Sequence, residues 1–138
     1  MRANAFGFYP LNGTPVIGFR AHSKQGSVRS FLKRIRKANR KSRIILILDN
    51  FKPHHSRSVV EYAKKLNIFL VFLPPYSPDL NPIEYIWKDV KRTISKTFIK
   101  NIGKMKRIIS MTFLKCSEKL GYAKSWIKKF VPQFSPNG

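Results

Sequence analysis

The chain of 138 residues is long enough for one compact domain, and 43% of its residues are hydrophobic, which excludes intrinsic disorder as the default state. It carries 28 Lys and Arg residues against 6 Asp and Glu, a formal net charge of +22. That charge predicts a polyanionic partner, and nucleic acid first of all. Its apolar runs are far shorter than the roughly 20 residues of a membrane span, so no membrane partner is expected. The single cysteine excludes an internal disulfide, in keeping with a reducing cytoplasm.

The chain begins with a predicted β-hairpin. Residues 3–9 and 14–20 are rich in Phe, Tyr, Val and Ile, and Asn12-Gly13 between them suits the positive-φ positions of a hairpin turn. The next segment, 26–40, is apolar at helical spacing and basic at most other positions, which predicts an amphipathic helix with a cationic outer face. Two candidate contacts to the DNA backbone lie on that face, Lys33 and Arg34.

A strand, a helix and a second strand are predicted next. Residues 44–48 are a continuous run of Ile and Leu, which is typical of a parallel strand buried on both faces. Residues 56–66 are apolar at helical spacing, and 68–73 form another continuous apolar run. This order predicts a right-handed βαβ unit, in which ligands bind beyond the carboxyl ends of the strands. Asp49 lies at that end of the first strand.

A proline-rich segment separates the second strand from a series of helices. Three prolines between residues 74 and 78 favour a rigid extended loop, and a helix is predicted over about 81–97. Two further basic helical stretches are predicted over roughly 101–119 and 122–130, before a tail at 132–138. The polar side of the first of these helices carries three more candidate contacts to the DNA backbone, Lys88, Lys91 and Arg92.

Asp49 and Glu84 are the most informative residues, because acids are so scarce in this chain. Each has a structural alternative. Glu84 suits the third position of a capping box that begins at Asn81, with Pro82 in the first helical turn, and Asp49 suits a turn after a strand. Together, the two carboxylates are expected to meet at one sheet edge, where they can hold Mg²⁺ or Mn²⁺ against a phosphate.

Two segments, 48–54 (LDNFKPH) and 73–87 (LPPYSPDLNPIEYIW), strongly resemble the DDE superfamily endonuclease domain, and more narrowly the mariner-like insertion-sequence transposases of bacteria and archaea. The resemblance runs from about Ala3 to Phe130. It implies an RNase H-like α/β fold, a mixed sheet flanked by helices, that cuts and joins double-stranded DNA with two Mg²⁺ or Mn²⁺ ions. Residues 1–131 are then a partial catalytic domain. Carried over, the second and third acids of the catalytic triad, both metal ligands, are Asp49 and Glu84, and the residues that shape the site are Asn50, His54 and Asn81.

The chain departs from the family pattern at its first acid. In the family this acid lies on the first strand, which precedes the hairpin and occupies the middle of the sheet. No remaining acid is in place to substitute for it, and the family's N-terminal helix-turn-helix module has no counterpart. We therefore expect two half-sheets with facing unpaired edges, which are costly to bury and favour aggregation.

These features lead to expectations about activity and partners. The isolated chain is expected to be inactive or nearly so, and only marginally folded, as a remnant of an element or the second frame of a split gene. Its expected partners are double-stranded DNA and either further copies of itself or a transposase segment encoded upstream, in the cytoplasm of a bacterium or archaeon and associated with the nucleoid. The alternative is a non-catalytic basic DNA-binding protein, either a remnant or an inhibitor of the intact enzyme.

Overall fold

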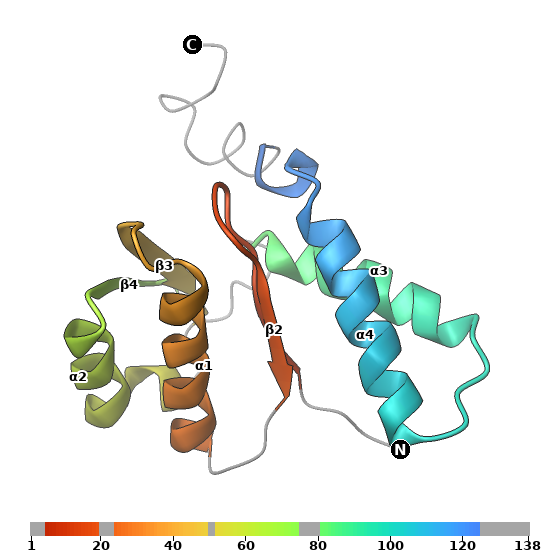
Figure 1. Cartoon of the computed structure of the whole chain (residues 1–138), viewed down its shortest axis with the longest axis horizontal. Coiled ribbons are helices and arrows are strands. Elements are labelled where there is room, and N and C mark those ends of the chain that lie inside the picture. Colours follow the sequence, from red (N-terminus) through yellow and green to blue (C-terminus); the bar gives the residue numbers. More distant parts are fainter. Residues whose placement is uncertain (1–4, 20–23, 50–51, 75–80, 125–138) are drawn as a thin grey trace.

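The structure of the protein, a computed structural model, contains two separate two-stranded sheets among the residues it describes (Figure 1). Strands β1 (Ala5–Phe8) and β2 (Val16–Phe19) pair antiparallel, and β3 (Ile44–Leu48) and β4 (Ile68–Phe72) pair parallel. The predicted hairpin and parallel strand pair are therefore confirmed. The described residues are 5–19, 24–49, 52–74 and 81–124.

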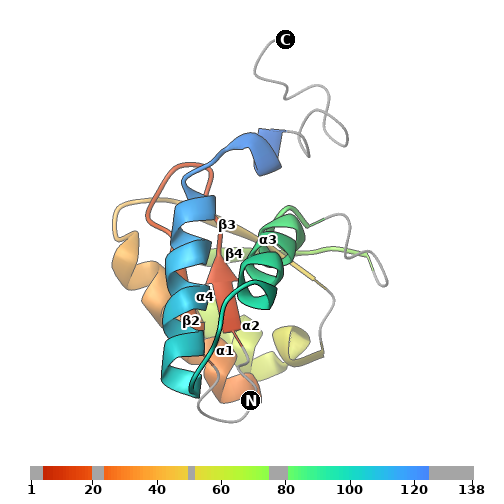
Figure 2. The ribbon, with the colours of Figure 1, turned by 90° about the vertical axis from the view of Figure 1, so that its right-hand side faces the viewer.

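Four helices form two groups, one on each side of the hairpin. Helices α1 (Lys24–Ala38) and α2 (Arg57–Lys65) contact each other, and α2 also contacts β4. Helices α3 (Ile83–Ser95) and α4 (Ile102–Ser117) contact each other, and α4 also contacts β2. Figure 1 shows the two groups apart, with β2 between them, and Figure 2 shows the molecule from the side of α3 and α4. Within the described part of the chain, no helix is long and apolar enough to cross a membrane.

The helices agree with the sequence prediction except at their ends. Helix α3 starts at Ile83, two residues later than predicted, and Pro82 is its N-cap residue. The predicted stretch 122–130 is described only through residue 124, within a helical turn over 121–124. The predicted tail at 132–138 lies outside the described residues.

Two apolar cores lie on opposite faces of the hairpin. Because side chains alternate along a strand, Phe6 and Phe8 of β1 face one core, and the neighbouring Ala5 and Tyr9 face the other. The first core is built by α1, α2 and the parallel strands, and the second by α3 and α4. The buried members of the first core are Val16, Val28, Leu32, Ile35, Ile44, Val59, Ala63 and Ile68, and those of the second are Ile86, Val90, Ile109, Phe113 and Cys116.

The prediction that the parallel strands are buried on both faces is wrong. Ile45 and Phe69, which are cross-strand neighbours, are each 68% exposed, and the next pair, Ile47 and Val71, are each 39% exposed. The reason is that α1 and α2 pack against one face of the pair, the face that carries Ile44 and Ile68. The other face of this half-sheet is left open.

Gly7 of β1 lets the second core pack directly against the hairpin. A Cβ atom at this position would lie 2.8 Å from Cζ2 of Trp87 and 2.5 Å from Cε2 of Phe113, whose rings stack with centroids 5.0 Å apart. Gly7→Ala is therefore expected to lower the free energy of unfolding by about 1–3 kcal/mol through overpacking. Urea unfolding checks this result. The matched control is Gly121→Ala, since nothing lies within 4 Å of that position, and an equal loss there would contradict the explanation.

Candidate active site

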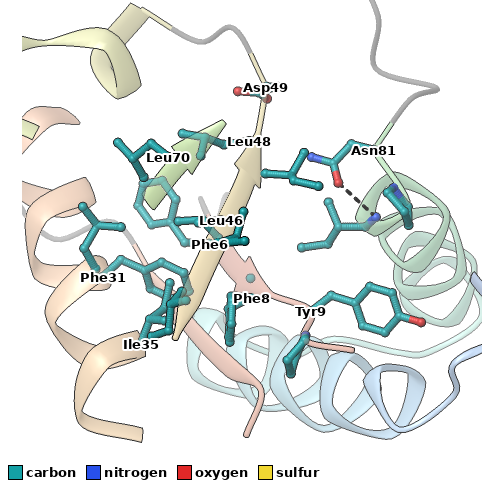
Figure 3. A pocket seen from close by; sticks show the side chains of 18 of the residues that line it. Phe6, Phe8, Tyr9, Phe31, Ile35, Leu46, Leu48, Asp49, Leu70 and Asn81 are labelled. Atoms are coloured by element: carbon teal, nitrogen blue, oxygen red, sulfur yellow. Dashed lines mark hydrogen bonds between the residues drawn. The ribbon is translucent and has the colours of Figure 1, made fainter. Parts of the chain in front are cut away.

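A cavity of about 650 Å³ opens between the two sheets, the hairpin β1–β2 and the pair β3–β4. It is lined by β1 and β3, by one side of α1 and by the start of α3, mostly with apolar side chains. Figure 3 shows Asp49 at the carboxyl end of β3 and Asn81 before the first turn of α3. Four residues that the sequence singled out line this cavity, Asp49, His54, Asn81 and Glu84.

The residue directly after β3, Asp49, presents a half-exposed carboxylate. Nδ1 of His54 lies 3.1 Å from Oδ1 of Asp49 and 3.5 Å from its backbone oxygen. A short 3₁₀ turn over Lys52–His55 brings His54 back to the end of the strand. The ring of His55 stacks on Phe72 of β4, with centroids 4.0 Å apart, and so holds this turn against the sheet. His54 is thereby positioned beside the acid.

Glu84 lies in the first turn of α3 and is partly buried. Burial raises the pKa of its carboxyl above the ordinary value, and the negative charge of Asp49 raises this pKa further. Lys91 and Lys88 oppose the shift in part. The structure therefore brings Asp49 and Glu84 close enough for their charges to interact. In the part of the chain that the structure describes, no group of three or more His, Cys, Asp or Glu side chains is placed to hold a metal ion.

The capping alternative for Glu84 lacks its defining contact. The backbone N–H of Glu84 donates to the backbone oxygen of Asn81 at 3.0 Å, and the N–H of Ile83 donates to Oδ1 of Asn81 at 3.4 Å. A capping box also needs the glutamate side chain to accept a hydrogen bond from the backbone N–H of the cap residue, and no such bond forms among the described residues. The role of Glu84 is therefore not explained by helix capping.

The candidate DNA contacts form two separate basic surfaces. Lys88, Lys91 and Arg92 are exposed on α3, where Arg92 pairs with Asp89 at 2.9 Å. Lys33 and Arg34 are exposed on α1, which lies on the other side of the hairpin from α3 (Figure 1). The last predicted site residue, Asn50, lies outside the described residues.

Glu84→Gln is expected to stabilise the chain slightly at neutral pH, by less than about 1 kcal/mol because solvent screens part of the interaction. A carboxyl whose pKa is raised by folding binds more protons in the folded state, so its contribution to stability falls as pH rises from the ordinary pKa through the raised one. This gain in the free energy of unfolding should disappear below about pH 4, where the carboxyl is protonated in both the folded and the unfolded state. Thermal unfolding across this pH range checks it. The control is Glu61→Gln, which removes an exposed glutamate paired with Arg57 and should give no gain, and a loss from Glu84→Gln at neutral pH would contradict the argument.

Comparison with known proteins agrees with these features. Residues 1–106 match the family model described as DDE superfamily endonuclease, and the chain belongs to this family. The family implies an RNase H-like fold, divalent metal ions and DNA as the partner, and the resemblance seen in segments 48–54 and 73–87 is confirmed.

Two transposable-element proteins are similar to parts of the chain. A stretch of 46 residues is 39% identical to the Transposable element Tcb2 transposase of Caenorhabditis briggsae and covers 33% of this chain and 17% of that protein. A stretch of 69 residues is 35% identical to the Insertion element IS630 uncharacterized 39 kDa protein of Shigella sonnei and covers 49% of this chain and 20% of that protein. The matched stretches thus span a fifth or less of either relative.

Proposed function

We propose that this chain is the portion of a DDE transposase catalytic domain that supplies two metal-binding acids, Asp49 and Glu84. The observation that carries the proposal is that these carboxylates come from different elements and line one cavity. The charge of Asp49 adds to the effect of burial in raising the pKa of Glu84. A divalent cation bound between two acids would relieve the repulsion between their negative charges. Membership of an endonuclease family supports the same function.

The donor set fits Mg²⁺ or Mn²⁺. Both ions prefer carboxylate oxygens and keep positions open for water and substrate phosphate. The half-exposed carboxylate of Asp49 is accessible to such a substrate, and His54 beside it restricts its orientation. In the complete enzyme, two such ions would stabilise the charge that develops during phosphoryl transfer. Asn50 and Asn81 are proposed to shape the same site.

The third acid is proposed to come from a strand that fills the cavity between the half-sheets. β1 and β3 both line this cavity, and each pairs with one neighbour among the described residues. We propose that a transposase segment encoded upstream, or another subunit, supplies this central strand of the RNase H-like sheet. The chain together with this segment is called the complete enzyme below. Without it, the chain is proposed to be inactive or nearly so.

Double-stranded DNA is the proposed substrate, as transposon ends and as target, in the cytoplasm of a prokaryote and on its nucleoid. Lys88 and Lys91 act electrostatically on Glu84, which supports the proposal that they hold a phosphate next to the acids. Lys33 and Arg34 are proposed to contact a more distant part of the DNA backbone, and Arg92 another. Such contacts are independent of base sequence and weaken steeply with salt.

The proposal is tested on the chain itself by titrating it with Mn²⁺ and following its amide resonances by NMR. The paramagnetic ion should broaden the signals of Asp49 and Glu84 together, at lower concentration than other acids. Asp49→Asn should raise the concentration that broadens Glu84, because one of its two carboxylate ligands is lost. The control is Glu118→Gln, which changes an exposed glutamate after α4. Equal broadening near all acids would rule out a specific site.

A further inference from the structure

The segment 119–124, which we call the clasp segment, is tied to the helix that carries Glu84. The hydroxyl of Tyr122 donates a hydrogen bond to Oδ2 of Asp89 on α3. The other carboxylate oxygen, Oδ1, accepts from Nη1 of Arg92 at 2.9 Å. Both oxygens of Asp89 are therefore engaged, and the side chain joins α3 to the clasp segment across 33 residues of sequence.

The same segment is also tied to the hairpin. The hydroxyl of Tyr9 donates to the backbone oxygen of Lys119 at 2.6 Å and accepts from the backbone N–H of Ala123 at 3.3 Å. The rings of Tyr9 and Tyr122 meet edge to face, with centroids 6.1 Å apart. Tyr9 and Ala123 both line the cavity that holds Asp49 and Glu84. The clasp segment thus connects β1 with α3 at the wall of the candidate site.

Among the described residues, the other contacts that α3 makes with the rest of the chain are mainly apolar packing contacts. Its buried residues, Ile86 and Val90, pack in an apolar cluster with Phe113, and apolar packing is not directional. At the N-terminus of the helix Pro82 provides no side-chain cap, and among the described residues the side chain of Asn81 makes only one hydrogen bond, which it accepts from the N–H of Ile83 at 3.4 Å. A directional hydrogen bond farther along the helix can fix the rotation of α3 about its axis. Because the helix backbone is regular, this also fixes the direction of the side chains in its first turn.

Asp89 is well placed for this role. It lies five residues after Glu84, about 7.5 Å along the helix axis. It is also about 140° around the helix from Glu84, so the two side chains face different neighbours. Burial and the hydrogen bond to Asp89 raise the pKa of Tyr122, which keeps its hydroxyl protonated as a donor.

We propose that Asp89 and Tyr122 are positioning residues, which hold α3 in the rotation that places Glu84 beside Asp49. This role rests on the proposed function of the two acids as metal ligands. Neither Asp89 nor Tyr122 is proposed to touch the metal or the DNA.

The test uses Tyr122→Phe in the full chain and Mn²⁺ alone as the probe. This change removes the hydroxyl, which donates to Asp89 and also lies beside Cys116 of α4. The Mn²⁺ concentration that half-broadens the Glu84 amide signal should rise by about tenfold, as for the loss of a group that orients a metal ligand. Amide hydrogen exchange should speed up in residues 83–87 more than in α1.

Two matched variants separate positioning from general destabilisation. Tyr62→Phe on α2 removes a hydroxyl that makes no hydrogen bond among the described residues, and it should leave both readouts unchanged. Asp89→Asn keeps an oxygen that can accept from Tyr122, so the Mn²⁺ concentration that half-broadens the Glu84 signal should change little. Asp89→Ala removes both oxygens and should raise that concentration as Tyr122→Phe does.

The outcomes distinguish failure of this inference from failure of the proposed function. If Tyr122→Phe lowers the melting temperature but leaves the Mn²⁺ response of Glu84 unchanged, the two residues stabilise the fold and do not position the acid, and the inference is overturned while the metal site stands. If the unaltered chain shows no broadening at Asp49 and Glu84, the metal site itself is refuted, and the positioning role with it.

Discussion

Asp49→Asn in the complete enzyme is expected to lower the rate of metal-dependent DNA cleavage by at least about a thousandfold, or roughly 4 kcal/mol in activation free energy. The substitution keeps the size of the side chain but removes the negative charge that would hold the cation opposite Glu84. DNA affinity should change little, because most of it comes from Lys and Arg contacts with phosphates. Nicking of a labelled duplex, measured beside binding at the same salt concentration, checks both expectations.

Two further variants complete this experiment. Glu84→Gln should be as inactive as Asp49→Asn, and the double variant should be no worse than either, because both acids are proposed to act on one site. Glu61→Gln on α2, which removes an exposed acid paired with Arg57, should keep full activity. Cleavage by Asp49→Asn within about tenfold of the unaltered enzyme would refute its role as a metal ligand.

A peptide strand that fills the cavity between the half-sheets is expected to raise the melting temperature of the chain by on the order of 10 °C. The stabilisation arises because the peptide binds only the folded state, which at a hundredfold excess over its dissociation constant amounts to about 2.7 kcal/mol. A suitable peptide has about six residues, apolar on both faces, because Phe31 and Ile35 lie on one side of the cavity and Ile83 and Trp87 on the other. Differential scanning fluorimetry measures the shift.

The position of the bound peptide is as informative as the shift. Hydrogen exchange should slow at the edges of β1 and β3, which line the cavity, and not at the outer strands β2 and β4. The control is the same peptide with Pro at alternate positions, which cannot donate the ladder hydrogen bonds. Protection of β2 or β4 instead, or an equal shift with the proline peptide, would contradict strand insertion at this place.

Much of the fold follows from local sequence patterns. Asn12-Gly13 and the flanking aromatic residues indicate the hairpin, but residues 9–15 connect its strands in the structure, and φ is positive at Gly13 and not at Asn12. The apolar runs 44–48 and 68–73 indicate two strands, and their parallel pairing follows from the helix between them. The structure has two separate two-stranded sheets among its described residues, and the expectation that they are halves of one sheet without its central strand stays a prediction. These features depend on short-range chemistry, which a single sequence displays.

The prediction that β3 and β4 are buried on both faces was wrong because burial of a strand face depends on tertiary packing. An unbroken apolar run such as 44–48 does not reveal which face a helix will cover, so it predicts burial on both faces. In the structure α1 and α2 cover one face, and Ile45 and Phe69 on the other remain 68% exposed. Coverage of a face depends on elements far away in sequence, and no local pattern encodes it.

The candidate site was predictable only in part. Asp49 and Glu84 stand out because acids are rare in the chain, and the motif around them suggested that they converge. Sequence alone could not separate a metal ligand from a helix cap at Glu84, because both uses favour Asn-Pro followed by Glu at a helix start. The bond between Tyr122 and Asp89 was not anticipated, since it joins residues 33 positions apart that belong to no shared motif.

Asp49 and Glu84 are proposed to form one divalent metal site. Anomalous diffraction from crystals of this chain soaked in Mn²⁺ tests it most directly, because it locates the ion without relying on activity. We predict an anomalous-difference peak for manganese about 2.0–2.5 Å from carboxylate oxygens of both residues. A peak bound by only one of them, or manganese elsewhere and none between them, would contradict the account.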